Sequence, residues 1–215
     1  MNMLTKMALG LIGQMRPDAP TGDSSPAVVL PPPQTQGGLP LMQALALRHS
    51  ERRFDTAALP AQTLSDLLWA AAGINRPEHG GRTAPSAMNS QEVDVYVALP
   101  EGLYLYDPQA HALQRVLAAD VRRVTGYQDF VDDAPLDLVY VADHARMKLV
   151  PAALRESYAS TAVGAMAQNV YLYCASAGLS TVIRAWIDRQ ALATAMGLGT
   201  DQQVMLAQTV GGTSP

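Results

Sequence analysis

The chain has 215 residues, of which 48% are hydrophobic and 16% charged, and its formal net charge is −4. This length and composition predict a globular fold with a substantial core, while the low charge content favours a surface partly covered by another subunit. A nucleic-acid partner is not expected, because no lysine-rich run is present. The single cysteine, Cys174, excludes a disulfide within the chain, and the four scattered histidines give little support to a metal site.

Residues 1–38 are predicted to form an N-terminal extension with a proline-rich arm, and residues 39–215 to form the folded domain. Lys6 and the apolar residues 7–13 are close to the shortest core of a signal peptide, but no small-residue cleavage site follows. We therefore expect a cytoplasmic protein, with export by a degenerate leader as the alternative. No stretch approaches the roughly 20 apolar residues that span a bilayer.

Seven prolines in residues 16–40 are typical of an extended arm without a core of its own. The folded domain then begins with two predicted helices, at residues 41–49 and 63–72. A turn-rich stretch, residues 75–89, separates them from the first strand. The second helix has apolar residues at the spacing i, i+3, i+4 and i+7, which predicts one buried face: Leu64, Leu67, Leu68 and Ala71.

The second half of the chain mixes predicted strands, at residues 93–99, 102–107, 136–142, 180–187 and 203–210, with predicted helices at residues 155–177 and 189–196. The run 136–142 is almost continuously apolar, so we expect it inside the sheet. The long helix 155–177 has no polar face in its middle and must be covered on every side, which predicts a core helix and a subunit contact. Without strict βαβ alternation, the pattern favours an α+β architecture.

Two polar segments suggest a phosphorylated heteroaromatic cofactor. Residues 48–55 read Arg-His-Ser-Glu-Arg-Arg-Phe-Asp, and an arginine fork is well shaped to bind a phosphate. Residues 85–91 read Pro-Ser-Ala-Met-Asn-Ser-Gln and supply neutral donors and acceptors for a ring edge or a sugar-like chain. The alternatives are a solvated basic helix end for the first segment and an ordinary loop for the second.

The chain resembles the FMN-dependent nitroreductase family over nearly all its length after the arm. The motifs occur in the family's order: Arg48-His49-Ser50-x-Arg52-x-Phe54, Pro85-Ser86-x-x-Asn89-x-Gln91, Gln168-Asn169, Gly178-Leu179-x-x-Val182 and Val210-Gly211. Residues 67–77, 81–87 and 129–131 also resemble short nitroreductase-like proteins related to the azoline dehydrogenases, which form thiazole and oxazole rings in peptides.

The resemblance implies a mostly antiparallel central sheet flanked by helices, in an intertwined homodimer with two FMN sites at the subunit interface. In the family, the counterparts of Arg48, Ser50 and Arg52 hold the FMN phosphate and ring edge, with that of His49 beside them. A turn from the second subunit is placed against the flavin, and its counterparts here are Pro85, Ser86, Ala87 and Asn89.

Further contacts with the flavin ring are implied by the same resemblance. Gln128 lies near the position of an amide that contacts the flavin. Ile183, Arg184 and Ala185 match the segment that packs on the ring. The backbone N–H of Ala185 would donate to N5, the atom that receives hydride, and a fixed donor there favours the reduced ring.

Two departures from the family pattern carry expectations of their own. Residues 183–186 read Ile-Arg-Ala-Trp where members often have Pro-x-Glu-Gly, so Trp186 is expected to change and narrow the substrate face. Members also often have Lys or Arg after the last Val-Gly, which this chain does not. Arg48 and Arg52 are therefore expected to bear most of the phosphate charge, with help from Arg184 or Arg82.

The sequence thus predicts an FMN-dependent oxidoreductase. NADH or NADPH would reduce the flavin, which would then reduce a small electrophilic acceptor, nitroaromatic or quinone-like, by ping-pong hydride transfer. No side chain is expected to be catalytic, because the chain has no G-x-S-x-G, Walker A or G-x-G-x-x-G motif and the cofactor supplies the chemistry. The alternatives are a non-catalytic flavin-binding or interaction module and an azoline dehydrogenase acting on peptides.

Overall fold

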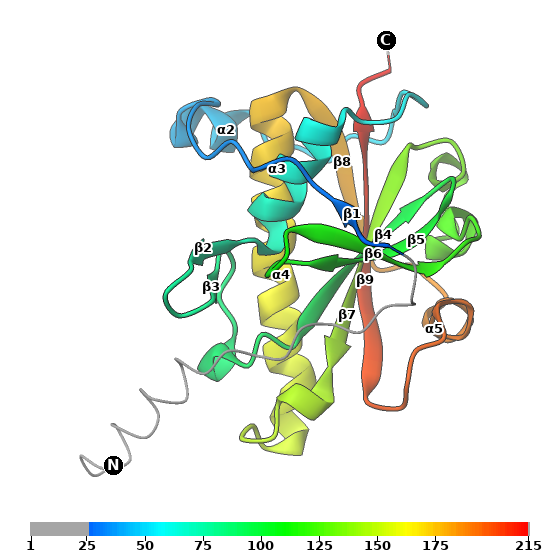
Figure 1. Cartoon of the computed structure of the whole chain (residues 1–215). Helices are drawn as coiled ribbons and strands as arrows, with labels where there is room; N and C mark the ends of the chain where they lie inside the picture. Colours follow the sequence, from blue (N-terminus) through cyan, green and yellow to red (C-terminus); the bar gives the residue numbers. More distant parts are fainter. Residues whose placement is uncertain (1–25, 215) are drawn as a thin grey trace.

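A seven-stranded antiparallel sheet is the centre of the computed structural model, which describes residues 26–214 (Figure 1). Its strand order is β1-β6-β5-β4-β7-β9-β8. The strands are β1 (Val28–Val29), β4 (Val93–Leu99), β5 (Gly102–Asp107), β6 (Ala112–Leu117), β7 (Leu136–Asp143), β8 (Leu179–Arg184) and β9 (Gln202–Gly212). A separate short hairpin joins β2 (Ile74–Arg76) to β3 (Gly81–Arg82). The predicted α+β fold with a mostly antiparallel sheet is confirmed.

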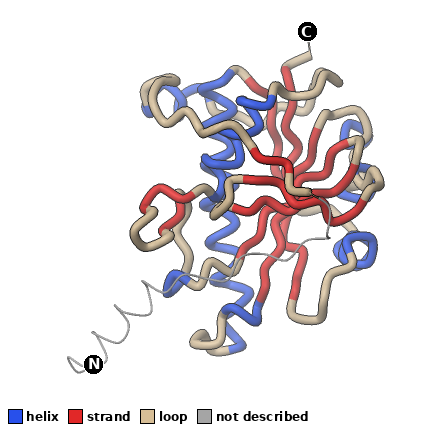
Figure 2. The backbone as a smooth tube through the Cα atoms, viewed as in Figure 1, coloured by secondary structure: helices blue, strands red, loops and turns tan. Residues whose placement is uncertain are grey.

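The helices cover the two faces of the sheet unequally. On one face lie α2 (Leu41–Leu47), α3 (Ala61–Ala72) and α4 (Ala152–Ala177), while the short α5 (Arg189–Met196) lies on the other (Figures 1 and 2). Helix α2 ends at Leu47, two residues before the predicted end, because the backbone of Arg48 is already extended in ψ, at 119°. Helix α4 ends at Gly178, whose positive φ of 69° suits glycine.

The position of strand β7 explains why its sequence is almost continuously apolar. It pairs with β4 on one side and β9 on the other, which confirms the predicted interior strand. Its alternate side chains enter two different cores. Leu138 and Tyr140 pack in the core under α3 and α4, whereas Val139 and Val141 pack in the core under α5.

The proline-rich arm packs on the domain from Val28 onward. Strand β1 pairs with β6, and Leu30 is buried in the main core. The Ser65 hydroxyl on α3 donates to the Pro31 carbonyl at 2.6 Å. The packed region therefore starts earlier than the boundary expected near Leu39. Residues 1–25, which include the predicted leader, lie outside the described residues.

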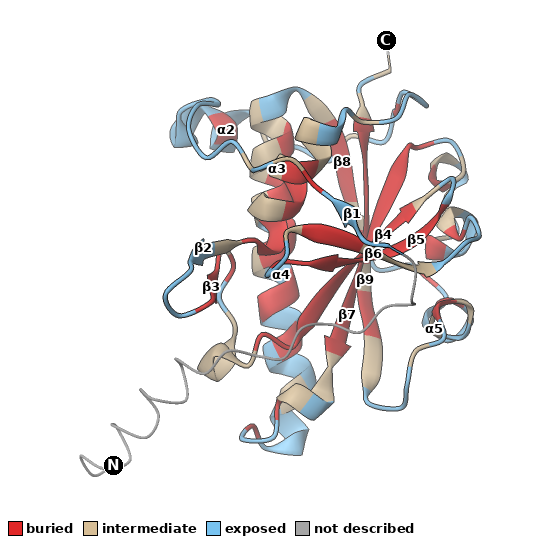
Figure 3. Ribbon diagram, in the orientation of Figure 1, coloured by how far each residue is buried: buried red, intermediate tan, exposed pale blue. Residues whose placement is uncertain are grey.

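One face of α4 is uncovered in the single chain, although its middle is apolar (Figure 3). Val163 and Met166 are buried in the main core. Gly164 and Gln168 are exposed, and a Cβ added at Gly164 would meet no atom within 4 Å. This chain alone therefore does not bury α4 on every side, although the sequence predicts such cover for that helix. None of the helices in residues 26–214 is both long and apolar enough to cross a membrane.

Candidate functional site

The arginine segment lies along the outer edge of the sheet, immediately after α2. The Glu51 N–H donates to the Thr181 carbonyl of β8 at 3.0 Å, which fixes the segment against that strand. Phe54 is buried and forms a β-bridge with Thr213. Backbone contacts at Glu51 and Phe54 therefore hold the second half of the segment, and the two arginine side chains between them, Arg52 and Arg53, are exposed.

Only one arginine of this segment is ion-paired with a carboxylate in the described part of the chain. Arg53 pairs with Glu51 at 3.4 Å. The hydrogen bonds from the Arg53 side chain and from the backbone of Arg52 and Arg53 lower the pKa of Glu51 to about 2. Within residues 26–214, Arg48 and Arg52 have no carboxylate partner. Two guanidiniums therefore remain available for an anion, which is the chemistry that a cofactor phosphate requires.

His49 lies beside these arginines but is held locally. Its Nδ1 lies 2.8 Å from the Leu47 carbonyl, and its Nε2 lies 3.9 Å from a Glu51 carboxylate oxygen. The ring is mostly exposed. The structure therefore places His49 next to the phosphate-binding candidates, as expected, with its ring turned back toward the end of α2.

Tyr171 of α4 connects the arginine segment to strand β8. Its hydroxyl lies 2.8 Å from Ser50 Oγ and accepts a hydrogen bond from the Ile183 N–H at 3.0 Å. Its ring lies beneath the Arg48 guanidinium, with 5.3 Å from Cζ to the ring centroid. Three predicted site residues, Arg48, Ser50 and Ile183, are thus gathered around one buried side chain. No sequence pattern singles out Tyr171, although a buried tyrosine generally needs a partner for its hydroxyl.

The end of β8 presents an open backbone donor. Ala185 follows the strand and is exposed, and no hydrogen-bond partner for its N–H is found within residues 26–214. Its carbonyl accepts from the Ile187 N–H at 3.1 Å, which makes a tight turn. An exposed and unpaired N–H at this point fits the expected donor to a ring nitrogen.

The side chain of Arg184 corrects one expectation. It is 4% exposed, and its Nη2 lies 2.6 Å from Oδ1 of the fully buried Asp137. Burial raises the pKa of the Asp137 carboxyl, and the Arg184 guanidinium opposes that rise. Arg184 also donates to the Thr125 carbonyl at 2.6 Å and to Gln128 Oε1 at 3.4 Å. It therefore points into the core and cannot assist Arg48 and Arg52 at a phosphate.

Arg82, the other suggested helper, is also buried. Its Nη1 donates to the Val93 carbonyl at 3.0 Å. Burial lowers the pKa of this guanidinium, and the nearby Asp94 carboxylate opposes the shift. The Arg82 side chain thus lies at the start of β4, bonded to Val93 and close to the Asp94 carboxylate. The expectation that it helps to hold the phosphate is wrong for this chain's own site.

The Ser/Asn turn is strained. Met88, Asn89 and Gln91 have φ values of 56°, 53° and 47°, which non-glycine residues rarely adopt. Gln91 holds the turn, because its N–H donates to Ser86 Oγ at 3.0 Å and its side-chain amide donates to the Gly80 carbonyl at 2.8 Å. Such strain persists only where the surroundings enforce it, and it clusters at ligand-binding and active sites.

The single chain does not bring this turn to the arginine segment. Helix α2 contacts the C-terminal part of α4, whereas the turn, Ala87–Asn89, lies near the N-terminal half of α4 (Figure 1). The predicted cofactor residues therefore fall into two groups. Arg48, Ser50 and the β8 end form one group, and Pro85, Ser86, Ala87 and Asn89 form the other.

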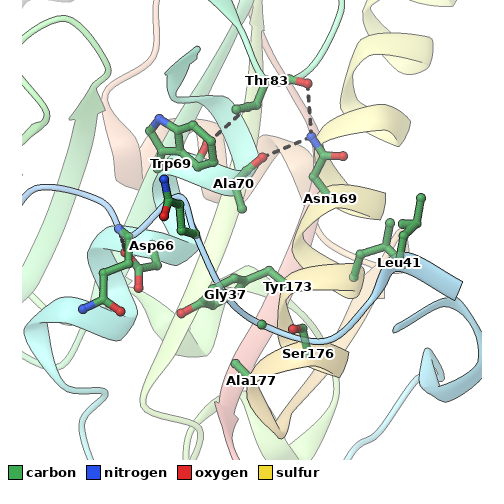
Figure 4. Close-up of a pocket in the computed structure, with 14 residues that line it drawn as sticks. Gly37, Leu41, Asp66, Trp69, Ala70, Thr83, Asn169, Tyr173, Ser176 and Ala177 are labelled. Atoms are coloured by element: carbon green, nitrogen blue, oxygen red, sulfur yellow. Dashed lines mark hydrogen bonds between the residues drawn. The ribbon is translucent and has the colours of Figure 1, made fainter. Parts of the chain in front are cut away.

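A surface pocket of about 530 Å³ opens between α3, α4 and residues 34–38 (Figure 4). Trp69, Tyr173 and Asn169 line it. Asn169, part of the Gln-Asn motif, donates to the Ala70 carbonyl at 3.1 Å and joins the two helices. None of the predicted cofactor-binding residues lines this pocket, so it is distinct from the arginine group.

Comparison with known proteins identifies the family to which this fold belongs. The profile of the nitroreductase family matches residues 45–212. The chain therefore belongs to the nitroreductase family. It is 34% identical over 152 residues to a "putative nitroreductase" of Methanocaldococcus jannaschii, covering 66% of this chain and 76% of that protein.

Solved structures agree with this assignment. A "putative nitroreductase" of Ralstonia eutropha JMP134 is 53% identical, with a TM-score of 0.85 over 94% of this chain and 96% of that chain. Another, from Desulfovibrio desulfuricans, was solved in complex with FMN. It shares the fold at a TM-score of 0.60 and 22% identity, over 83% of this chain and 89% of that chain. Family membership makes the chain an oxidoreductase of the flavin type.

Proposed function

We propose that the chain is an FMN-dependent NAD(P)H oxidoreductase that reduces small electrophilic acceptors and works as a homodimer. When bound, FMN would supply two-electron chemistry, carrying the hydride of NADH or NADPH to a quinone, which would become the hydroquinone, or to a nitroaromatic, which would become the nitroso compound and water, with protons drawn from solvent. The chain itself would bind and orient the ring, and none of its side chains is assigned a proton-transfer role.

The observation that carries this proposal is a pair of guanidiniums, Arg48 and Arg52, that have no carboxylate partner among the described residues and stand in the segment bonded to β8. Arg48 and Arg52 would hold the phosphate, because each can make two charge-assisted hydrogen bonds to it. The Ala185 N–H would donate to the ring, and Gln128, tied to Arg184, would lie near it. Tyr171 would keep the two parts in register through its bonds to Ser50 and Ile183. The FMN complex of the Desulfovibrio relative supports the choice of cofactor.

The proposed homodimer explains two features of the single chain. Helix α2 exposes apolar side chains, among them Leu41 at 62% and Met42 at 75%, which would be costly in an isolated subunit. The open face of α4 at Gly164 would allow another helix to approach closely. A second subunit placed there would supply its own Pro85, Ser86, Ala87 and Asn89 to the flavin, which reunites the two groups of site residues.

An absorbance titration of the purified protein with FMN tests the proposal. We expect a perturbed flavin band with saturable binding, and anaerobic addition of NADH or NADPH should then bleach it. If the flavin binds but neither nucleotide bleaches it, the chain is a flavin-binding module without this activity. That second candidate is favoured by the exposed Trp186, which stands directly after Ala185 and could obstruct the nucleotide. If no flavin binds, both are contradicted.

A further inference from the structure

Two exposed aromatic rings stand together beside the end of β8. Trp186 is 71% exposed and Tyr127 is 55% exposed, and their ring centroids lie 5.4 Å apart at an interplanar angle of 46°. They come from loops that are nearly 60 residues apart in sequence. Trp186 directly follows Ala185, so the pair adjoins the backbone donor already described.

A buried network holds the two loops together beneath these rings. The Arg184 guanidinium, next to Trp186 in sequence, donates to the Thr125 carbonyl at 2.6 Å and to Thr125 Oγ1 at 3.0 Å. It also pairs with the buried Asp137, which accepts from Thr125 Oγ1 at 2.9 Å. Both loops are therefore anchored on one ion pair, which fixes the backbone from which the two rings extend.

Gly126 shows how closely the two loops are fitted. A Cβ at this position would lie 1.9 Å from Arg184 Nη1 and 2.5 Å from Gln128 Oε1. Any side chain there would push the guanidinium out of its place under the loop. The position before Tyr127 thus has to be glycine for the loop to close over Arg184.

One carboxylate, that of Asp188, lies beside the pair. The Asp188 carboxylate interacts with Tyr127, and it also caps α5 by accepting from the Ala191 N–H at 2.9 Å. A ligand that stacks on these rings would therefore meet a carboxylate at one side. This arrangement favours uncharged ligands over anionic ones.

We propose that Trp186 and Tyr127 form a stacking platform that selects uncharged, planar aromatic acceptors of about the size of a naphthoquinone. This inference rests on the proposed function, because the platform adjoins the segment that would carry the flavin ring. Aromatic rings attract flat π-systems by offset stacking and remove a large apolar area from water. An acceptor held there would lie at the edge of the reducing ring, and its selection would follow from ring shape and charge rather than from hydrogen bonds.

The two tryptophans of the chain permit a direct test, since Trp69 lines the α3–α4 pocket and Trp186 lies in the platform. In full-length Trp69→Phe protein, all tryptophan fluorescence comes from Trp186. Titration with 2-methyl-1,4-naphthoquinone, without NADH or NADPH, should quench this fluorescence saturably and by a static mechanism, in which the fluorescence lifetime stays unchanged. The anion 1,4-naphthoquinone-2-sulfonate should bind about ten-fold more weakly. In Trp186→Leu protein, Trp69 should show only collisional quenching.

Three results would overturn the platform. They are unsaturable quenching of Trp186, equal affinity for the sulfonate, and saturable quenching of Trp69 in the Trp186→Leu protein, which would place the aromatic site in the pocket. Tyr127→Ala should weaken naphthoquinone binding about three-fold, while Tyr127→Phe, which keeps the ring, should not. FMN affinity is measured separately in each variant. A protein that binds FMN but not the naphthoquinone contradicts only the platform, and one that binds no FMN contradicts the proposed function itself.

Discussion

The Tyr171 hydroxyl lies 2.8 Å from Ser50 Oγ and at the same time accepts the N–H of Ile183 at 3.0 Å. A side chain of the central helix α4 therefore sets the distance between the segment proposed to hold a phosphate and the strand end proposed to face a ring. Few other bonds cross between these two elements, the nearest being that from Glu51 to Thr181. The position of Tyr171 is thus expected to affect both ends of the cofactor at once.

Tyr171→Phe should lower both stability and FMN affinity. The ring would stay beneath Arg48, but the Ile183 N–H would lose its partner, which costs about 1–3 kcal/mol when the group is buried. Urea unfolding and FMN titration measure the two effects. Tyr173→Phe is the matched control, because its hydroxyl donates to the Thr63 carbonyl on α3 and not to the site. Equal FMN affinity in Tyr171→Phe and wild type would remove Tyr171 from the site.

Arg48→Ala and Arg52→Ala should each weaken FMN binding by about 1.5–3 kcal/mol, since each removes a charged hydrogen-bond partner of the phosphate. The loss should shrink with added salt, and riboflavin, which lacks the phosphate, should bind wild type and variants alike. Arg53→Ala is the control, because Arg53 already pairs with Glu51. If Arg53→Ala loses as much affinity as the other two, the phosphate assignment is wrong.

The buried Arg184–Asp137 pair should be costly to break from one side. Arg184→Met or Asp137→Leu alone would leave an uncompensated charge or its former partners unpaired, and we expect a loss of about 3–5 kcal/mol in the free energy of unfolding. The double variant should lose clearly less than the sum of the two. Urea unfolding of all four proteins closes the cycle, and simple additivity would show that the two groups do not interact.

His111 should make stability depend on pH. Its Nε2 lies 2.7 Å from Ser65 Oγ and 3.1 Å from the Pro31 carbonyl, and its Nδ1 lies 2.9 Å from the Tyr106 hydroxyl. Burial lowers the pKa of His111, although Pro31 and the Asp66 carboxylate oppose the shift. The folded chain therefore favours the neutral ring.

The sign of this effect follows from proton uptake. As the pH falls through about 6.5, the unfolded chain protonates His111 before the folded chain does, so the free energy of unfolding decreases, while above that pH the contribution is constant. Urea unfolding between about pH 5.5 and pH 8 measures it. His111→Gln should flatten this part of the profile, whereas the exposed His79→Gln should not. A profile that is unchanged in His111→Gln would contradict the assignment.

Gly164→Arg should separate the proposed subunits without unfolding either one. The added side chain meets open space in the single chain, and arginine is a better helix former than glycine by about 0.8 kcal/mol. Sedimentation should show a dimer for wild type and for Gly164→Ala, and a monomer for Gly164→Arg. An unchanged dimer in Gly164→Arg would place the subunit contact on another face.

Much of the fold could be predicted because its signals are local. The apolar run of β7 and the periodic apolar residues of α3 each report the surface that they bury. The interior position of β7 is confirmed, and of the predicted α3 face Leu67, Leu68 and Ala71 are buried while Leu64 is half-buried against the same core. Strand β6 was missed because half of its side chains are only partly buried, among them Gln114 and Arg115, so its pattern is not alternating. The partners of β1 are likewise set by long-range pairing, which two residues cannot encode.

The candidate site, like the fold, could be predicted only in part. Residue types predicted the arginine segment, and the resemblance predicted the strand end, but neither could show where a side chain points. Arg184 is polar and adjacent to the expected ring segment, yet it turns into the core because Asp137 on a neighbouring part of the sheet is buried there. Tyr171 could not be found from its neighbours in sequence, because its role arises only where α4, β8 and the arginine segment meet.

Strand β1 also protects the sheet. Val28 and Val29 pair with Leu113 and Ala112, and so occupy an edge of β6 that would otherwise offer unpaired backbone groups to other molecules. A chain shortened to begin at residue 39 would leave that edge bare and would also expose the apolar site that Leu30 fills. Such a chain should aggregate during refolding at concentrations where the full-length chain recovers.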